Sequence, residues 1–323
     1  MPVISVVIPA YNAERTILET VQSVLEQSFS DFELIIINDG STDKTLELLS
    51  LIKDSRIKVF SYQNGGLPVA RNRGIERSTG QFISFLDADD LWTSDKLECQ
   101  LLALQAAPNA GVAYSWTCNM SATGDSFYPG HSVSYSGDVY PKLLVSNFIA
   151  SGSNCLIRRE AIDFAGRFDA FLKSYEDWDY WLRLASSWSF VVVPKYQILY
   201  RQSPGAMSSR IDVMQEYGLI VIEKAFQSAP NSLKSLKRQS LSTNYQYLAG
   251  MCLININEKE KLRKAGENLR KAIYSYPPIL FTKETQRYLL KWLFVQFSLP
   301  KIIKLFINPA RSSNCMGDPR LQN

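Results

Sequence analysis

Short apolar runs alternate with amphipathic stretches through the first part of the chain. The runs are rich in β-branched residues and end in turn-forming residues, which predicts buried strands. Between the runs, apolar residues recur at helical spacing, as Ile17, Val21 and Val24 do. The predicted strands cover residues 4–8, 32–37, 57–60, 82–86 and 112–116. The predicted helices cover residues 13–27, 44–53, 68–77 and 94–106.

Strand and helix follow each other in turn, which predicts an α/β fold with a mostly parallel central sheet covered by helices. Ligands bind such sheets at the carboxyl ends of the strands. The polar side chains that follow the predicted strands at these ends are Tyr11, Asn12, Asn38, Asp39, Asp87 and Asp89. The sequence therefore predicts a binding site along one edge of the sheet.

The pattern changes after residue 120. Residues 121–138 are rich in serine, glycine and tyrosine, which predicts a loop. Shorter elements follow, with helices over 140–147 and 177–185, an apolar segment at 154–157 and a strand at 190–193. The pattern is then helical only, over 211–228, 233–253 and 259–275. We expect a catalytic domain over 1–208 and a helical C-terminal region over 209–323 that associates with a membrane or oligomerises.

The far C-terminus is apolar with interspersed lysine. Residues 288–297 are mostly apolar but include Lys291, and residues 301–307 have the same character after Pro300. Tryptophan and lysine beside apolar residues suit a membrane interface, whereas the other reading is a helix packed on the catalytic domain. Peripheral membrane contact through residues 288–307 therefore stays open beside that packing.

Composition fits a globular enzyme. The chain has 323 residues, of which 46% are apolar and 20% charged, and its net charge of +4 gives no reason to expect a nucleic-acid partner. Five cysteines without metal-like spacing predict free thiols in a reducing compartment. Neither a signal peptide nor an apolar span of about 18 residues is visible. We therefore expect a cytoplasmic protein, peripheral on the inner face of the cell membrane if its C-terminus binds there.

An acidic cluster follows the predicted strand at 82–86. Its residues are Asp87, Ala88, Asp89 and Asp90. Carboxylates on a turn at the end of a strand can hold Mg²⁺ or Mn²⁺ through oxygen ligands, and the metal could neutralise the charge on a departing nucleotide diphosphate. Acidic clusters also cap helices without binding metal, so the cluster alone leaves both readings open.

Two further polar positions have a chemical and a structural reading. Asp39, at the end of the second predicted strand, could accept a hydrogen bond from a base N–H, or it could cap the next helix, as Asp43 could. Arg71 could stack on a base or pair with phosphate, or it could be a solvated charge on a helix.

A second acidic pair, Glu176 and Asp177, stands beside aromatic residues at the start of a predicted helix. An ionised Asp177 could be a general base toward a hydroxyl, and aromatic neighbours such as Trp178 could stack on a sugar ring. The structural alternative is stabilisation of the helix N-terminus by acidic residues.

Five motifs in this order resemble those of family 2 glycosyltransferases with the GT-A fold. They are residues 9–12, 38–43, 66–74, 86–90 and 176–183, and the resemblance covers about residues 2–205. It implies a GT-A-type nucleotide-binding sandwich and an inverting transfer of a sugar from a nucleotide-diphosphate sugar, usually a UDP-sugar, to an acceptor hydroxyl. Such proteins commonly act in surface polysaccharide or glycan biosynthesis, with a saccharide or lipid-linked saccharide as acceptor.

The resemblance also implies a role for each matching position. The nucleotide would contact Pro9, Ala10, Tyr11, Asn12, Asp39, Arg71, Asp87 and Ala88. Among these, Asp39 would face the base and Asp87 would lie on the ribose side. Asp89 would bind the Mn²⁺ or Mg²⁺ that holds the diphosphate, and Asp177 would be the catalytic base. Sugar or acceptor contacts would come from Gly152, Ser153, Glu176 and Trp178.

One position departs from the family pattern. Many relatives carry a histidine shortly after the last core strand, and this chain has Ser203 there. Arg201 could supply positive charge instead, while the single histidine, His131, lies in a predicted loop. A non-catalytic nucleotide-sugar-binding or scaffold protein therefore stays an alternative. A sugar-nucleotide pyrophosphorylase is less favoured, because no glycine-rich loop follows the first strand.

Overall fold

The computed structural model describes residues 1–130, 132–203, 210–254 and 258–297. The described chain forms two compact units. The first holds residues 1–130, 132–140 and 148–203, and the second holds residues 141–147, 210–254 and 258–297. The predicted boundary after residue 208 lies outside the described residues and stays a prediction.

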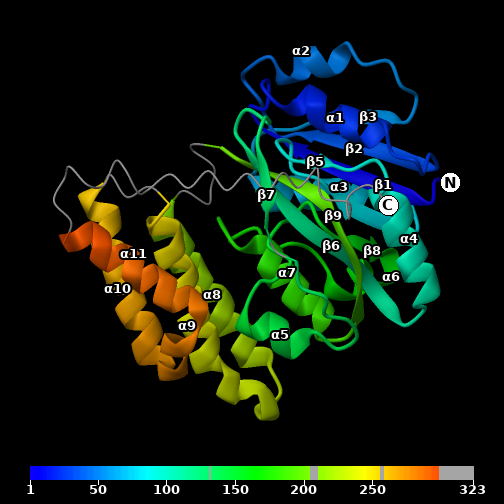
Figure 1. Ribbon diagram of the computed structural model, residues 1–323. Helices are drawn as coiled ribbons and strands as arrows, with labels where there is room; N and C mark the ends of the chain where they lie inside the picture. The colour runs from blue at the N-terminus through cyan, green and yellow to red at the C-terminus, as the bar shows by residue number, and fades with distance from the viewer. Residues whose placement is uncertain (131, 204–209, 255–257, 298–323) are drawn as a thin grey trace. The chain divides into compact units, whose positions relative to one another are not determined.

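One mixed sheet organises the first unit (Figure 1). Among the described residues its strand order is β3-β2-β1-β4-β8-β6-β9-β5, and β7 pairs with β6. The strands are β1 Ile4–Ala10, β2 Phe32–Asn38, β3 Ile57–Ser61, β4 Phe82–Phe85, β5 Leu91–Trp92, β6 Ala110–Ser121, β7 Phe127–Pro129, β8 Leu156–Arg158 and β9 Ser189–Gln202. Strands β1 to β4 run parallel, as do β6 and β9, whereas β8 is antiparallel to its neighbours. The predicted mostly parallel sheet is confirmed.

Helices cover both faces of the parallel strands. The helices of this part of the chain are α1 Ile17–Leu25, α2 Thr45–Ser50, α3 Leu67–Arg77, α4 Lys96–Ala106, α5 Tyr140–Val145, α6 Arg159–Ala165 and α7 Glu176–Ala185. Val6 and Ile8 of β1 share a buried cluster with Ile17 of α1. Val7 points to the other face, where a Cβ on Gly74 of α3 would lie 2.2 Å from its Cγ1. Burial on both faces explains why the strands are continuous apolar runs.

Several elements differ from the sequence prediction. The helix expected over 13–27 begins only at Ile17, because the chain first makes a turn in which Asn12 adopts a φ of 49°. β6 and β9 extend well beyond the predicted 112–116 and 190–193, because their outer residues, polar and apolar, pair with each other along a parallel ladder. The loop expected over 121–138 contains β7, and α6 was not expected.

The second unit is helical, as its periodicity predicts. Its elements beyond residue 210 are α8 Ile211–Ser228, η2 Asn231–Leu236, α9 Lys237–Cys252, α10 Lys259–Ser275, η3 Pro277–Phe281 and α11 Lys283–Phe297. A Cβ on Gly250 would lie 2.7 Å from the hydroxyl of Tyr288, and one on Gly266 would lie 2.7 Å from the ring of Trp292. Glycine therefore lets α9 and α10 receive these two aromatic side chains of α11. None of the described helices is both long and apolar enough to cross a membrane.

Candidate active site

The loops that follow β1, β2 and β4 meet at one edge of the sheet, because these strands run parallel. Hydrogen bonds continue the sheet beyond the strand ends. Asp39 N–H donates to the carbonyl of Ala10 at 2.8 Å, and Leu86 N–H donates to the carbonyl of Val7 at 3.0 Å. The predicted site residues of the first three motifs and of the acidic cluster therefore share this edge.

The residues after β1 shape the first loop. Pro9 and Ala10 are buried in the strand itself. Asn12 holds the neighbouring loop, since its Oδ1 accepts the N–H of Thr42 at 2.8 Å and its own N–H donates to Ser41 Oγ at 3.1 Å. Tyr11 is 54% exposed. Pro9 and Ala10 thus shape the end of the strand and Asn12 holds the loop, while the exposed side chain of Tyr11 is open to solvent; the expected nucleotide contacts of all four stay predictions.

Asp39 is buried and anchors a glycine-rich loop. Its carboxylate accepts the N–H of Gly65 at 3.0 Å and that of Gly66 at 2.8 Å. Arg73 adds an ion pair at 2.7 Å. The N–H of Gly65 also lies 3.1 Å from the second carboxylate oxygen. A carboxylate offers about four acceptor positions, so all of them are taken, and the N–H of a base would have to replace one of these donors.

Arg73 is a site residue that the sequence did not single out. Its guanidinium pairs with Asp39 and lies 4.5 Å from the ring centroid of Tyr62. Arg71 and Arg73 are two residues apart on α3, so their side chains leave the helix in roughly opposite directions. That spacing is the signal that only one of them could face Asp39. The structure gives this position to Arg73, whereas Arg71 pairs with Asp87 and Glu176.

The acidic turn after β4 is held from several sides. The carbonyl of Ala88 accepts hydrogen bonds from Thr16 Oγ1 at 2.7 Å and from Thr20 Oγ1 at 3.0 Å. The N–H of Asp87 donates to Ser153 Oγ at 3.0 Å, and that hydroxyl donates to Asp90 Oδ2 at 2.6 Å. Ser153 is fully buried. It therefore supports the turn, and its expected contact with a sugar stays a prediction.

The three aspartates of this turn are electrostatically different. Asp90 is buried and accepts hydrogen bonds from Ser153 and from the backbone N–H of Arg201, so its part is structural. Asp87 and Asp89 are partly exposed. Burial and the negative charge of Asp87 raise the pKa of Asp89 to about 6. The folded chain thus holds two neighbouring carboxylates whose negative charges repel each other.

This pair fits a hard divalent cation. Carboxylate oxygens are the ligands that Mg²⁺ and Mn²⁺ prefer, and a cation would relieve the repulsion that raises the pKa of Asp89. In the part of the chain that the structure describes, no group of three or more His, Cys, Asp or Glu side chains could hold a metal. Phosphate oxygens of a bound nucleotide and water would have to complete the coordination.

The second acidic pair begins helix α7. Tyr175 precedes it with a φ of 58°, which turns the chain sharply into the helix. Asp177 is partly exposed, and its Oδ1 accepts the N–H of Trp178 at 2.6 Å. Burial and the charge of Glu176 raise the pKa of Asp177 to about 7, although Arg71 opposes the shift. A carboxyl group with this pKa can exchange a proton near neutral pH.

Trp178 packs inside the protein. It is only 2% exposed, and its ring centroid lies 5.6 Å from that of Tyr175. The expected stacking of Trp178 on a sugar stays a prediction. Aromatic residues at the first turn of a helix can point either way, and here the apolar face of α7 takes this one into the core.

Arg71 connects the two acidic pairs. Only 1% of its side chain is exposed, and its guanidinium donates to Asp87 at 2.6 Å and to Glu176 at 2.7 Å. Gly152 lies against it, since a Cβ at that position would come within 2.2 Å of Nη2. Gly152 and Glu176 thus both contact this guanidinium, and their expected contacts with a sugar or acceptor stay predictions.

Arg201 lies close to Asp89, the candidate metal ligand. Its Nε donates to the carbonyl of Asp89 at 2.8 Å, and its Nη2 pairs with Glu19 at 2.6 Å. The positive charge lowers the pKa of Asp89 against the larger effect of burial. Ser203, which replaces the family histidine, is partly exposed, while His131 lies outside the described residues.

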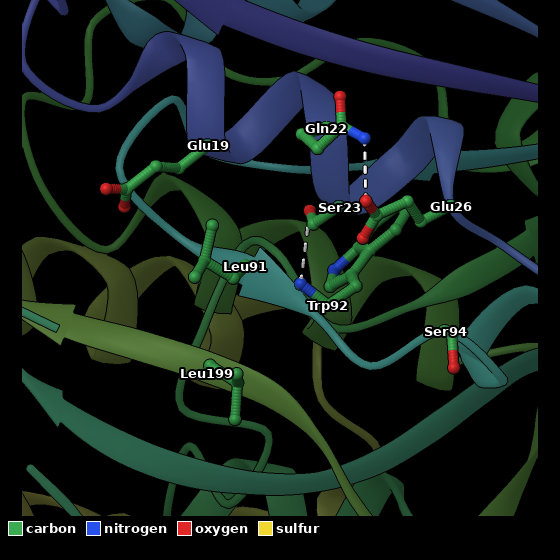
Figure 2. A pocket seen from close by; sticks show the side chains of 8 residues that line it. All are labelled: Glu19, Gln22, Ser23, Glu26, Leu91, Trp92, Ser94 and Leu199. Atoms are coloured by element: carbon green, nitrogen blue, oxygen red, sulfur yellow. Dashed lines mark hydrogen bonds between the residues drawn. The ribbon is translucent and has the colours of Figure 1, made fainter. Parts of the chain in front are cut away.

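A groove of about 300 Å³ lies beside α1, and its residues differ from the predicted site (Figure 2). Its walls are Glu19, Gln22, Ser23, Glu26, Leu91, Trp92, Ser94 and Leu199. Glu19 of this wall is the residue that pairs with Arg201. The groove thus adjoins the support of the acidic turn.

Comparison with known families shows to which family the chain belongs. The model of the family described as "Glycosyltransferase like family 2" matches residues 5–250. The chain belongs to this family. A Rickettsia felis protein described as an uncharacterized glycosyltransferase is 32% identical over 268 residues, which are 81% of this chain and 43% of that protein. This chain thus spans less than half of the length of that glycosyltransferase.

Other glycosyltransferases share shorter stretches or the fold. The Escherichia coli UDP-Glc:alpha-D-GlcNAc-diphosphoundecaprenol beta-1,3-glucosyltransferase WfgD is 34% identical over 44% of this chain and 54% of its own length. The structure of S. aureus TarS with UDP-GlcNAc has a TM-score of 0.61 at 19% identity, over 91% of this chain and 87% of that one. The Pyrobaculum calidifontis mannosyltransferase PcManGT with GDP-Man and Mn²⁺ has a TM-score of 0.58 at 18% identity, over 91% and 85%. The predicted GT-A fold of this chain is confirmed.

Proposed function

We propose that the chain is an inverting glycosyltransferase that transfers a sugar from a UDP-sugar to an acceptor hydroxyl with the help of Mn²⁺ or Mg²⁺. The observation that carries the proposal is the arrangement of two acidic pairs about Arg71. Asp87 and Asp89 supply oxygen ligands on the donor side, and Asp177 supplies a carboxyl group with a pKa of about 7. This division of labour suits a single displacement, which needs one metal-binding group and one base.

In the proposed reaction, Asp177 takes the proton from the acceptor hydroxyl as that oxygen bonds to the anomeric carbon. The bond from this carbon to the diphosphate breaks on the opposite face, and the nucleoside diphosphate leaves with the electron pair. A divalent cation at Asp89 would neutralise the charge on that leaving group. An α-linked donor then gives a β-linked product.

Two features support a uridine nucleotide. The carboxylate of Asp39 lies at the site edge, where a base N–H would replace one of its present donors, and the exposed ring of Tyr11 lies on the next loop along this edge. TarS binds UDP and UDP-GlcNAc, while PcManGT binds GDP-Man with Mn²⁺. Other nucleotides therefore belong in the first binding experiments.

The acceptor proposed is a saccharide, free or linked to a lipid, in surface polysaccharide or glycan biosynthesis. WfgD is named for a diphosphoundecaprenol-linked acceptor, and the Bacillus subtilis relative TuaG is named a putative teichuronic acid biosynthesis glycosyltransferase. These names support the class of acceptor for this chain.

Helix α11 supports peripheral contact with an anionic membrane. Its outer face combines the exposed side chains of Leu290, Leu293 and Phe294. Burial, and to a smaller extent the charge of Arg287, lowers the pKa of Lys291. Apolar and basic side chains on one helix face suit an anionic lipid surface. The continuation of the predicted segment, residues 298–307, lies outside the described residues.

Sedimentation with vesicles tests this contact. Full-length protein should sediment with vesicles that contain anionic phospholipid and much less with neutral ones. Leu290→Asp should weaken this binding, whereas Leu102→Asp, which changes an exposed leucine of α4, should not. Equal effects of the two substitutions would argue against α11 as the membrane surface.

Titration calorimetry of UDP, with and without Mn²⁺, tests the donor site. We expect Mn²⁺ to increase the affinity, and we expect Asp89→Ala to remove the increase. Hydrolysis of a UDP-sugar without acceptor then separates the enzyme from the alternative of a non-catalytic binding or scaffold protein. Binding without any hydrolysis or transfer would favour that alternative.

A further inference from the structure

A single buried guanidinium joins the donor side of the site to the base side. Arg71 Nη2 pairs with Asp87 at 2.6 Å and Nη1 pairs with Glu176 at 2.7 Å. These partners stand 16 and 105 residues away along the chain. Asp87 follows β4, and Glu176 opens α7 next to Asp177. The contact therefore ties together two segments that would otherwise be fixed independently.

The surroundings of Arg71 are built to hold this one orientation. The ring of Phe168 lies 5.3 Å from the guanidinium carbon. Phe168 is fixed in turn by two hydrogen bonds to the amide of Asn72, at 2.8 and 2.9 Å. On another side, Gly152 leaves the space that any Cβ would fill. Lysine could not replace this arginine, because one ammonium group lacks the two-pronged planar geometry.

We propose that Arg71 and Glu176 are positioning residues, which hold the base Asp177 in a fixed relation to the donor-side carboxylate Asp87. The inference rests on the proposed role of Asp177 and deepens it. In this proposal Asp177 contacts the acceptor, whereas Arg71 and Glu176 do not. These two residues fix the position of Asp177 and surround it with charge.

The charged groups around Asp177 predict the sign of the pKa change that each substitution causes. Glu176 lies on its own helix, Arg71 comes from α3, Asp87 follows β4, and Cys155 precedes β8. Glu176 and Asp87 raise the pKa of Asp177, while Arg71 lowers it. Removing the charge of Glu176 and removing that of Arg71 must therefore move the pKa of Asp177 in opposite directions.

The test is a pH titration of the Asp177 carboxyl carbon by NMR in ¹³C-aspartate-labelled full-length protein, assigned with Asp177→Asn. We expect Glu176→Gln to lower the pKa of Asp177 and Arg71→Gln to raise it, each by roughly one pH unit. Arg77→Gln changes an exposed arginine of the same helix and should leave the titration unchanged. Shifts below about 0.2 units in both test variants, or shifts in the same direction, would overturn the inference.

Kinetic measurements test the positioning role with variants that keep the positive charge at residue 71. Arg71→Lys should lower kcat about 100-fold, with a much smaller effect on KM for the donor, because the base loses its alignment. Gly152→Ala should act in the same sense while the protein still folds, since only the end of the Arg71 side chain has to move. Wild-type kcat for Gly152→Ala would count against the inference. A wild-type protein without transfer would instead refute the proposed function, and the NMR titration would still decide the inference.

Discussion

Buried or half-buried carboxylates occur at both ends of the central sheet, and their surroundings are opposite. Glu33 lies near the amino ends of the strands, where it accepts hydrogen bonds from Ser5 and Thr79 at 2.7 Å and pairs with Lys58 at 2.8 Å. Burial alone would raise the pKa of Glu33, but these donors lower it to about 2. At the carboxyl ends, Asp89 and Asp177 face other carboxylates, and their pKa values rise to about 6 and 7.

This difference distinguishes a carboxylate that stabilises the fold from carboxylates that suit a role in binding or catalysis. The fold stabilises ionised Glu33, so its charge is already neutralised before any ligand binds. It penalises ionised Asp89 and Asp177, which a cation or a proton can stabilise. Residues held at such a disadvantage are typical of functional sites, where stability is given up for chemistry.

The largest expected effect is on turnover. Asp177→Asn should lower the transfer rate by about 10³-fold or more, since an amide cannot take a proton from the acceptor. UDP affinity should change less than about twofold. Parallel measurements of product formation and of UDP binding check this. A variant that transfers at the wild-type rate would remove Asp177 from the proposed mechanism.

The pH dependence should follow the ionised form of the base. Because the pKa of Asp177 is raised to about 7, kcat at saturating donor should rise with pH through this region. Below it, the rate should fall about tenfold for each pH unit. A pH–rate profile from pH 5 to 9 measures this. A flat profile would show that Asp177 titrates elsewhere or is not the base.

A smaller effect is expected on stability at the opposite end of the sheet. Glu33→Gln should destabilise the fold by roughly 2–3 kcal/mol at pH 7, because hydrogen bonds to a charged acceptor are lost. Since the folded-state pKa of Glu33 is lowered from 4.5 to about 2, this contribution is present above pH 4.5 and is lost as the pH falls toward 2. Denaturant unfolding at pH 7 and pH 3 checks both statements. Equal differences between variant and wild type at the two values would contradict them.

The smallest effect has the opposite sign. Asp89→Asn removes a repelled carboxylate, so at pH 8 without metal it should stabilise the fold by about 0.5–1 kcal/mol. Added Mn²⁺ and UDP should raise the melting temperature of the wild type more than that of the variant. Thermal melts with and without these ligands measure both. A destabilised variant would place Asp89 with Glu33 as a structural acid.

The alternation of strands and helices along the chain and the polar strand ends could be predicted from the sequence, because apolar runs and polar strand exits are local patterns. Asp87 and Asp89 were singled out in this way, whereas Asp177 was singled out from its acidic pair at the start of a predicted helix. The contacts of Arg73, Ser153, Thr16 and Thr20 could not be predicted from local patterns, because each residue has its partner far along the chain. Two arginines at helix positions two apart leave the helix on different sides, and the sequence does not say which side meets which acid.

The supports of the acidic turn have a consequence for how the protein folds. Asp90 is held by Ser153, 63 residues further on, and by the backbone of Arg201, 111 residues further on. Contacts across such long separations close late, because the loop entropy must be overcome first. A chain still being synthesised therefore has no finished acidic turn until β9 has emerged, and the proposed cation site is completed only together with the sheet.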